Sequence, residues 1–402
     1  MRSEEELSKD AARKFLVHRQ FFLQEKGKDG TLKAVKSLEC VQRDPISVIH
    51  CNQHLVLHNR VTDYSPRYLE ELLYKDRLLF EYWCNEKSVI PIEDFPYFRY
   101  RMRNPSQFHS PFYERIKRRR QELKDHLSLV LSEIRKQGPL SSRELKQSGR
   151  VGGRMATSVL NLLWDFGELM IHHEEGNRRY FDLTEHVLPS NVDSWTPTKE
   201  EFEQFMVEKY IRAHGLADTR NWRFGWLPLK AFQRKAIVEE MVKEGKLIPV
   251  RIEGVKHVYH VIKGHFSFLK SPDQAGKDRV YFIAPLDNLI WNRKAILEIF
   301  DFSYSWEVYK VPDRRIYGYY VMPILFDSRF VGRLDPKLDR KNSMLIINSI
   351  WLEKDKLDME TFLEAFSATL KRFLRFHNAS RFTIKRSEPR AFRKDLITKL
   401  KH

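Results

Sequence analysis

Carboxylate, amide and imidazole side chains can perform hydrolytic chemistry, but none of them stands here in the spacing of a common catalytic motif. The sequence has no G-x-x-x-x-G-K-[ST], no G-x-G-x-x-G after a predicted strand and no H-E-x-x-H. Nucleotide hydrolysis, dinucleotide chemistry and zinc hydrolysis therefore lack their usual scaffolds. Gln42 and Asp44 stand two residues apart in VQRDPISV (41–48). Taken alone, Asp44 is most simply a turn residue and Gln42 a surface amide, because Asp-Pro commonly initiates turns.

The charge balance indicates a polyanionic partner. Lys and Arg total 71 against 54 for Asp and Glu, which gives the 402 residues a formal net charge of +17. Such an excess attracts nucleic acid, mainly because binding releases the counterions condensed on its phosphates. The alternative is a basic surface that serves only solubility, and composition does not decide between the two.

One basic segment, YFRYRMR (97–103), interleaves its charges with aromatic rings. Arginines in such a pattern can follow a phosphate backbone while the rings pack near sugars or bases. We predict that Arg99, Arg101 and Arg103 contact DNA in this way. A solvated helix face is the alternative explanation of the same pattern. His172-His173 lies beside a predicted hairpin, where partial exposure explains the pair better than metal binding does.

Cysteine usage and hydropathy predict a cytoplasmic protein. Cys40, Cys51 and Cys84 are odd in number and form no C-x-x-C pair, which disfavours a disulfide framework or a cysteine-based zinc site. The N-terminal stretch is charged and has no apolar signal core, and no apolar run approaches the ~18 residues of a membrane span. We expect a cytoplasmic, nucleoid-associated protein without membrane contact, metal or cofactor. We also expect a monomer, because no heptad seam is evident.

The order of predicted elements indicates an α+β protein with two helix-hairpin modules. Residues 124–188 are predicted to form three helices and a hairpin that turns at Glu175-Gly176-Asn177, and Ser141 with Glu144 forms a capping box at the second helix. This is the order of a winged helix, whose third helix can enter a major groove. Residues 199–262 partly repeat it with two helices and a hairpin. The alternative is an ordinary helical scaffold whose hairpins touch no DNA.

Strands dominate from about residue 279. YFIAPLD, YGYYVMPILF, FVGRLDPKL and MLIINSIWLE are short apolar runs separated by polar turns, which predicts an antiparallel sheet or small barrel. An amphipathic helix near 358–377 and a basic tail follow. We therefore divide the chain into an N-terminal helical or winged-helix region with the Gln-x-Asp motif (1–123), two winged helices (124–190 and 191–265) and a C-terminal antiparallel β-domain with a terminal helix and basic tail (266–402).

Several sequence blocks, taken together and in order, resemble a known family. They are Gln42-x-Asp44, HLVLHNRVTDY (54–64), EYWCNE (81–86) with DFPYFRYRM (94–102), PLDNLIWNRK (285–294), FDFSYSWEVY (300–309) and YGYYVMPILFDSRFVGRLDPKLDR (317–340). The ordered set is similar to the winged-helix DNA glycosylases of the AlkX (YcaQ) type, which are relatives of AlkZ. The resemblance covers about residues 9–390, and the 317–340 block is its most specific part.

The resemblance implies both a fold and an activity. The implied fold is a C-shaped assembly of tandem winged helices and a C-terminal β-domain that encircles part of a duplex. The implied activity is monofunctional excision of N7-alkylated purines from double-stranded DNA, including the unhooking of crosslinks joined through such bases. It releases the base without cleaving the strand.

In that family, catalysis belongs to a Gln-hydrophobic-Gln or Gln-hydrophobic-Asp motif, whose outer positions match here as Gln42 and Asp44. The resemblance implies that Asp44 orients or deprotonates the attacking water, while the Gln42 amide holds that water or the sugar, with no metal. The middle position departs from the family pattern, because it is Arg43. Asn85 in EYWCNE stands where the family often has His.

Further basic residues are predicted to contact DNA rather than to catalyse. They are Arg43 in the motif and Arg293, Lys294, Arg333 and Lys337 beside predicted turns. Asp287 and Asp335 are expected to be turn or cap residues. The competing hypothesis is a non-enzymatic winged-helix regulator or architectural protein, for which two winged helices and a basic surface suffice.

Overall fold

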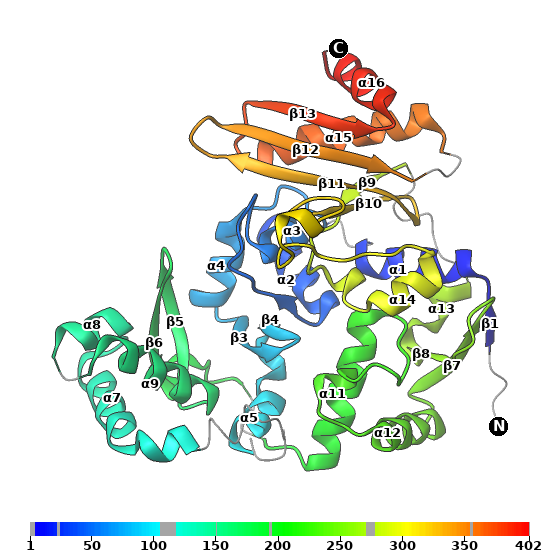
Figure 1. Cartoon of the computed structure of the whole chain (residues 1–402). Helices are drawn as coiled ribbons and strands as arrows, with labels where there is room; N and C mark the ends of the chain where they lie inside the picture. Colours follow the sequence, from blue (N-terminus) through cyan, green and yellow to red (C-terminus); the bar gives the residue numbers. More distant parts are fainter. Residues whose placement is uncertain are drawn as a thin grey trace. The chain divides into compact units, whose positions relative to one another are not determined.

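The computed structural model describes residues 5–21, 25–104, 118–149, 151–192, 195–270, 278–353 and 357–401. They form two compact units. The larger unit comprises Met1–Ser65, Tyr210–Asn221 and Val238–His402, and the smaller unit comprises Pro66–Lys209 and Trp222–Ile237. Each unit contains both helices and strands (Figure 1), which confirms the predicted mixed α+β class.

The larger unit is built from the two ends of the chain. Its N-terminal elements are β1 (Glu5–Leu7), α1 (Lys9–Phe21), α2 (Gly27–Leu38), β2 (Val41–Gln42) and α3 (Asn52–His58). Its later elements are β7 (Leu247–Ile252), β8 (Tyr259–Ile262), α13 (Phe266–Lys270), β9 (Val280–Phe282), η5 (Asn288–Ile290), α14 (Arg293–Phe300), η6 (Pro312–Arg314), β10 (Met322–Phe326), β11 (Arg329–Asp339), β12 (Met344–Leu352), α15 (Met359–Phe376), β13 (Arg381–Glu388) and α16 (Arg390–Lys401).

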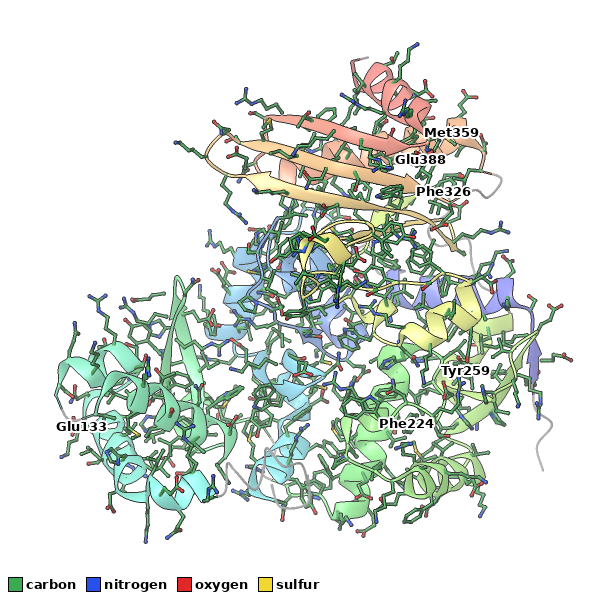
Figure 2. The ribbon with its side chains drawn as sticks, in the orientation of Figure 1. Glu133, Phe224, Tyr259, Phe326, Met359 and Glu388 are labelled. Carbon is green, nitrogen blue, oxygen red and sulfur yellow. The ribbon has the colours of Figure 1, made fainter. Side chains whose placement is uncertain are left out.

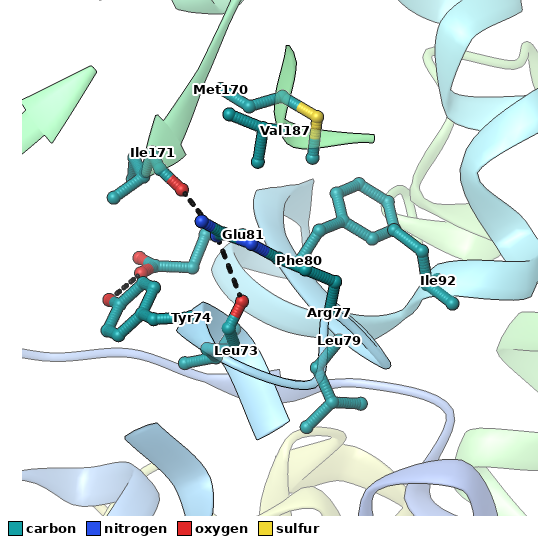
Figure 3. A pocket seen from close by; sticks show the side chains of 10 residues that line it. All are labelled: Leu73, Tyr74, Arg77, Leu79, Phe80, Glu81, Ile92, Met170, Ile171 and Val187. Carbon is teal, nitrogen blue, oxygen red and sulfur yellow. Dashed lines mark hydrogen bonds between the residues drawn. The ribbon is translucent and has the colours of Figure 1, made fainter. Parts of the chain in front are cut away.

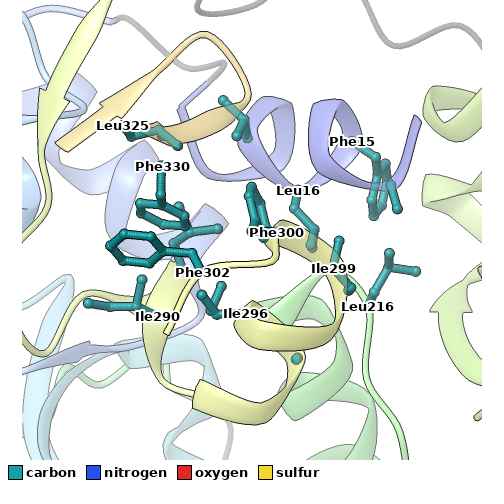
Figure 4. Close-up of a cluster of buried hydrophobic side chains, with 14 of the residues drawn as sticks. Phe15, Leu16, Leu216, Ile290, Ile296, Ile299, Phe300, Phe302, Leu325 and Phe330 are labelled. Atoms are coloured by element: carbon teal, nitrogen blue, oxygen red, sulfur yellow. The ribbon is translucent and has the colours of Figure 1, made fainter. Parts of the chain in front are cut away.

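Helix α1 buries its apolar face in the core of the larger unit. Phe15 and Leu16 are at most 4% exposed and belong to the same cluster as Ile299 and Phe300 of α14 (Figure 4). Full burial of each such side chain stabilises the fold by about 1.5–3 kcal/mol. Arg13 fixes the approach, because it donates to the backbone carbonyl of Ile299 (2.7 Å). Helices α1 and α14 are therefore part of the same core, although more than 270 residues separate them in the sequence.

The C-terminal strands form a five-stranded sheet in the order β13-β12-β11-β10-β9 (Figure 1). The strands from β9 to β12 pair antiparallel, as predicted. The expected purely antiparallel sheet is wrong at one edge, because β13 pairs with β12 in parallel. Parallel neighbours need a crossover connection, and the helix predicted near 358–377, α15, provides it. The basic tail from residue 378 supplies β13 and α16.

The smaller unit contains the three helices and the hairpin predicted over 124–188. They are α7 (Lys124–Gln137), α8 (Ser142–Gln147), α9 (Gly153–Asp165), β5 (Leu169–Glu175) and β6 (Arg178–Leu183), followed by α10 (Thr184–Val187). The predicted capping box is present, because Ser141 and Glu144 bond each other's backbone N–H groups at the start of α8. The unit begins with α4 (Pro66–Tyr74), β3 (Leu79–Cys84), β4 (Glu86–Pro91), η1 (Ile92–Asp94) and α5 (Phe95–Arg103).

The segment 199–262 contains the two predicted helices, α11 (Lys199–His214) and α12 (Ala231–Lys243), and the hairpin β7–β8. The sequence pattern did not indicate the third strand of this sheet. It is β1, near the start of the chain, which pairs with β7 in parallel and makes the sheet three-stranded. On β8, Tyr259 (labelled in Figure 2) donates its hydroxyl to Glu298 of α14 at 2.6 Å. This hairpin is thereby attached to the core of the larger unit.

Candidate functional site

Gln42 lies at the end of β2 and is 7% exposed. Its backbone carbonyl accepts a hydrogen bond from the side-chain amide of Asn52 (2.9 Å), the first residue of α3. The segment before it is fixed by Asn288, whose amide donates to the carbonyls of Leu38 (3.0 Å) and Cys40 (2.9 Å). Two buried amides from other elements therefore set the position of the Gln42 backbone.

Asp44 is half-buried and folds back on its own loop. Its Oδ1 accepts the backbone N–H of Ile46 (2.9 Å) across Pro45, which is an Asx-type turn and agrees with the expectation for Asp-Pro. Gln53 Oε1 accepts the backbone N–H of Asp44 (3.4 Å). Burial raises the pKa of Asp44, and the hydrogen bond from Ile46 offsets part of that shift. A raised pKa makes the ionised carboxylate a stronger base.

The rest of the loop is held by the end of β11. Leu338 donates its backbone N–H to the carbonyl of Val48 (3.2 Å). The guanidinium of Arg340 donates to the carbonyl of Ile49 (2.7 Å) and to the hydroxyl of Ser47 (2.9 Å). Strand β11 thus fixes the loop that follows Asp44, although almost 300 residues separate them in sequence. Sequence reasoning missed Arg340, which is the last residue of the longest family-like block.

Three histidines beside this loop are neutral at physiological pH. Burial, with smaller contributions from His50 and then Arg43, lowers the pKa of His54 to about 3. Burial, followed by the charge of Arg340, lowers the pKa of His50 to about 4. Burial also dominates at His58, whose pKa falls to about 2. The imidazoles therefore place no positive charge beside Asp44. The i, i+4 spacing of the two histidines in HLVLH was the only sequence signal for this group.

The end of α3 is anchored by a buried ion pair. The two terminal guanidinium nitrogens of Arg60, Nη1 and Nη2, donate to the carboxylate of Asp287 at 2.8 Å, and these side chains are 2% and 0% exposed. Asp287 also accepts the backbone N–H of Leu289 as the cap of η5, so the predicted cap role is confirmed. Asn59 donates to the carbonyl of Phe282 (2.8 Å). The blocks HLVLHNR and PLDNLIW are therefore joined in space, and together they position α3.

Comparison with known proteins agrees with the sequence blocks. The family model described as "DNA glycosylase AlkZ-like" matches residues 35–376. The chain belongs to the AlkZ-like DNA glycosylase family. The fold is also similar to that of the Streptomyces sahachiroi DNA glycosylase AlkZ, with a TM-score of 0.64 and 16% sequence identity over 96% of this chain and 100% of that chain. The predicted family is thus confirmed, and DNA is the substrate class that this family implies.

In this AlkZ-like glycosylase, the basic residues of the larger unit predicted to contact DNA fall into two groups. Lys294 and Lys337 are exposed. Arg333 is 5% exposed: its guanidinium donates to Glu353 (2.7 Å) and to a backbone carbonyl, and it lies between the rings of Phe302 (4.4 Å) and Tyr317 (4.1 Å). Contacts within the protein thus hold the Arg333 guanidinium, so its interactions favour a structural role.

Arg293, like Arg333, has a guanidinium held by contacts within the protein, whereas its neighbour Lys294 is exposed. Its guanidinium donates to the carbonyl of Pro285 (2.7 Å) and lies 4.3 Å from the centre of the Tyr304 ring. Arg43 is half-buried and acts electrostatically on His54. Asp335 lies within β11 instead of in a turn, and accepts the backbone N–H of Tyr320 (2.8 Å).

Helix α5 of the smaller unit carries the other three predicted DNA contacts. Arg99 donates to the carbonyl of Trp195 (3.0 Å) and Arg101 to that of Trp83 (3.2 Å), and both are half-buried. Arg103, at the end of the helix, is exposed. Asn85 is 7% exposed and lies at the turn between β3 and β4.

Two pockets of the AlkZ-like glycosylase do not suit a nucleic acid. The pocket in Figure 3 is lined mostly by apolar side chains, and the guanidinium of Arg77 in its lining is held by the carbonyls of Leu73 (3.2 Å) and Ile171 (3.4 Å). A cavity of about 340 Å³ in the larger unit is lined by four carboxylates and by two cations, Lys14 and Arg329. Its carboxylates outnumber its cations, which disfavours a phosphate there. These carboxylates are Asp10, Asp278, Asp327 and Asp358.

Among the residues that the structure describes, no group of three or more His, Cys, Asp or Glu side chains could hold a metal ion. None of the helices in this described part of the chain has both the length and the apolar character needed to cross a membrane.

Proposed function

We propose that this AlkZ-like glycosylase excises N7-alkylated purines from double-stranded DNA and unhooks crosslinks joined through such bases. The observation that carries the proposal is the half-buried carboxylate of Asp44, whose pKa is raised by burial, two residues after the buried Gln42. Cleavage of an N-glycosidic bond passes through an oxocarbenium-like transition state, which a nearby carboxylate stabilises. Neutral imidazoles around the loop leave the Asp44 charge available for that cation.

The proposed reaction needs no metal and no strong acid. The bond between sugar C1′ and purine N9 breaks, and its electron pair neutralises the cationic N7-alkylpurine as it leaves. The oxygen of a water molecule bonds to C1′, and Asp44 accepts the proton of that water. The Gln42 amide holds the water or the sugar. The products are the free base and an abasic site, and the strand stays intact because no lysine serves as a covalent nucleophile.

DNA is held, in this proposal, by tandem winged helices and exposed cations. Helix α9 with the hairpin β5–β6 has the order of a recognition helix and wing. Lys294, Lys337 and Arg103 are exposed and can contact phosphates, which positions the duplex without selecting a sequence. An assembly that wraps the duplex in a C shape tolerates bulky adducts, because it does not enclose a flipped base in a tight pocket.

The test is single-turnover release of N7-methylguanine from a duplex that carries one such lesion. Asp44→Asn and Gln42→Ala are each expected to lower the rate constant by about 100-fold or more, the scale of losing a preorganised electrostatic group, while affinity for the duplex is retained. Glu364→Gln is the matched control, because Glu364 is an exposed carboxylate on α15 of the same unit. The abasic product is expected to break only after alkaline treatment.

Two results would contradict the proposal. Wild-type rates in both variants would remove Gln42 and Asp44 from the reaction. Sequence-selective binding of undamaged DNA, with no release from any alkylated duplex or crosslink, would favour the regulatory hypothesis instead.

A further inference from the structure

A loop between α14 and β10 exposes apolar side chains that the proposed reaction does not use. Tyr309 is 80% exposed, Ile316 69% and Val311 57%. Apolar surface in water is unfavourable, and three large apolar side chains on one short loop indicate a surface that a partner covers. We call residues 309–319 the exposed loop.

The exposed loop has a fixed conformation, because a buried carboxylate binds its backbone. Glu307 is 1% exposed and accepts the backbone N–H groups of Ile316 (3.0 Å) and Tyr317 (2.9 Å). It also accepts a hydrogen bond from the ammonium of Lys310 (2.9 Å). Gly318 closes the loop with φ 146°, where a Cβ would come within 2.3 Å of Asp335. The apolar tips are therefore held in water instead of collapsing onto the protein.

Ring contacts lead from the exposed loop to Tyr320, whose hydroxyl senses the charge of Asp44. Trp306 contacts the ring of Tyr309 (5.6 Å between centroids) on one side and that of Tyr320 (6.1 Å) on the other. Burial raises the pKa of Tyr320, with further contributions from Tyr304 and then from the charge of Asp44. The base of the loop is therefore within electrostatic range of Asp44, and all these residues belong to the larger unit.

The charge of the exposed loop suits a polyanion. Arg314 is exposed, and Arg315 lies 4.8 Å from the ring of Tyr319. Lys310 is paired with Glu307, so Arg314 and Arg315 are left with one carboxylate among residues 309–319, that of Asp313. Apolar tips flanked by cations are the combination that architectural proteins insert between base steps, where the apolar group unstacks the bases and the cations bind phosphates.

We propose that the exposed loop is a wedge that enters the damaged duplex beside the target nucleotide, with Tyr309 and Ile316 unstacking the neighbouring base step and Arg314 holding the backbone. The inference rests on the proposed function, because it takes the duplex to be bound at Asp44. It adds the part of the enzyme that opens the helix around the lesion. Glu307 is a positioning residue, because it acts only through the conformation of the loop.

The test uses the full chain and a duplex that contains a tetrahydrofuran abasic analogue next to 2-aminopurine, whose fluorescence rises when it is unstacked. Wild-type protein is expected to increase this fluorescence. Tyr309→Ser combined with Ile316→Ser is expected to abolish the increase and to raise the dissociation constant about tenfold, the scale of losing stacking on a base. Tyr309→Phe keeps the ring and should behave as wild type.

Two controls separate the wedge from a general loss of structure. Met359→Ser removes a 41% exposed apolar side chain from the start of α15 in the same unit and should change neither signal. Glu307→Gln keeps the size of the side chain but removes its charge, so it should reduce the fluorescence increase. The double serine variant should keep wild-type thermal stability, because both of its replaced side chains are exposed.

The outcomes distinguish this inference from the proposed function. Wild-type fluorescence and affinity in the double serine variant would overturn the wedge, and would leave a protein partner as the occupant of the loop. Failure of wild-type protein to bind or unstack the duplex would overturn it as well. If wild-type protein unstacks the duplex but releases no N7-methylguanine, the wedge stands and the proposed function fails.

Discussion

Replacing Asp287 by Asn leaves the guanidinium of Arg60 buried without a counter-charge. The carboxylate is 0% exposed and makes both 2.8 Å contacts with Arg60. Breaking a buried pair by removing one partner costs about 3–5 kcal/mol. We expect the lower end of that range, because Arg60 keeps its hydrogen bonds to the carbonyls of Gln20 and Val56, each at 2.9 Å.

The free energy of unfolding can be measured by urea denaturation followed by circular dichroism. Asp301→Asn is the matched control, because Asp301 pairs with Lys9 and Arg13 while its side chain is 61% exposed. Exposed pairs contribute at most about 1 kcal/mol. The double variant Arg60→Met/Asp287→Leu is expected to lose less stability than Asp287→Asn, because an apolar pair removes both desolvation penalties.

The reasoning is refuted if Asp287→Asn costs no more than Asp301→Asn. It is also refuted if Arg60→Met/Asp287→Leu loses as much stability as Arg60→Met and Asp287→Leu, each measured alone, added together, because two coupled partners cannot give additive effects. In either case, the ion pair would not be the contact that positions α3.

Three further predictions concern titration and DNA contact. Burial raises the pKa of Asp44 above 3.8, so the native state holds this proton more tightly and loses stability as pH rises through the raised pKa. Asp44→Asn should therefore leave the melting temperature at neutral pH equal or higher, although it lowers the rate of base release by about 100-fold or more. Burial lowers the pKa of His58 from 6.5 to about 2, so the stability that the neutral imidazole contributes is lost as pH falls below 6.5. His58→Phe retains a ring against Phe376. It should make the loss of stability in acid shallower, as measured by urea titrations down to about pH 5. Arg333→Ala should lower the free energy of unfolding by about 2–4 kcal/mol. Lys337→Ala should keep the melting temperature, and the salt dependence of its DNA binding should correspond to the release of about one ion fewer. The reverse result would exchange the roles of the two residues.

Local patterns in the sequence predicted much of the secondary structure. The capping box at Ser141, the hairpin turn at Gly176-Asn177 and the amphipathic helix α15 depend on residues that are neighbours in the chain, so their types and spacing suffice. The parallel edge strand β13 and the short strand β1 were missed. Each is defined by its pairing partner, and β1 has only three residues with no alternating apolar pattern.

The site shows the same division. The Asp-Pro pair predicted the turn at Asp44, because the side chain bonds a backbone group two residues away. The sequence could not show that Arg340 fixes the same loop or that the histidines beside it are neutral, because both depend on desolvation by distant segments. Likewise, Arg333 and Lys337 are both basic residues of one strand, yet only the packing around them decides that the first is buried against Glu353 and two rings while the second is exposed.

By itself, then, the sequence determined the family, the positive charge that draws the chain to DNA, and the turn that carries Asp44, because residue type and local spacing are enough for each. The tertiary structure alone decided which charges are in water and which are buried, since a pKa or a free cation depends on the neighbours that folding brings from elsewhere in the chain. It also decided that residues 309–319 remain exposed. Only packing shows that the buried carboxylate of Glu307 holds this loop in place.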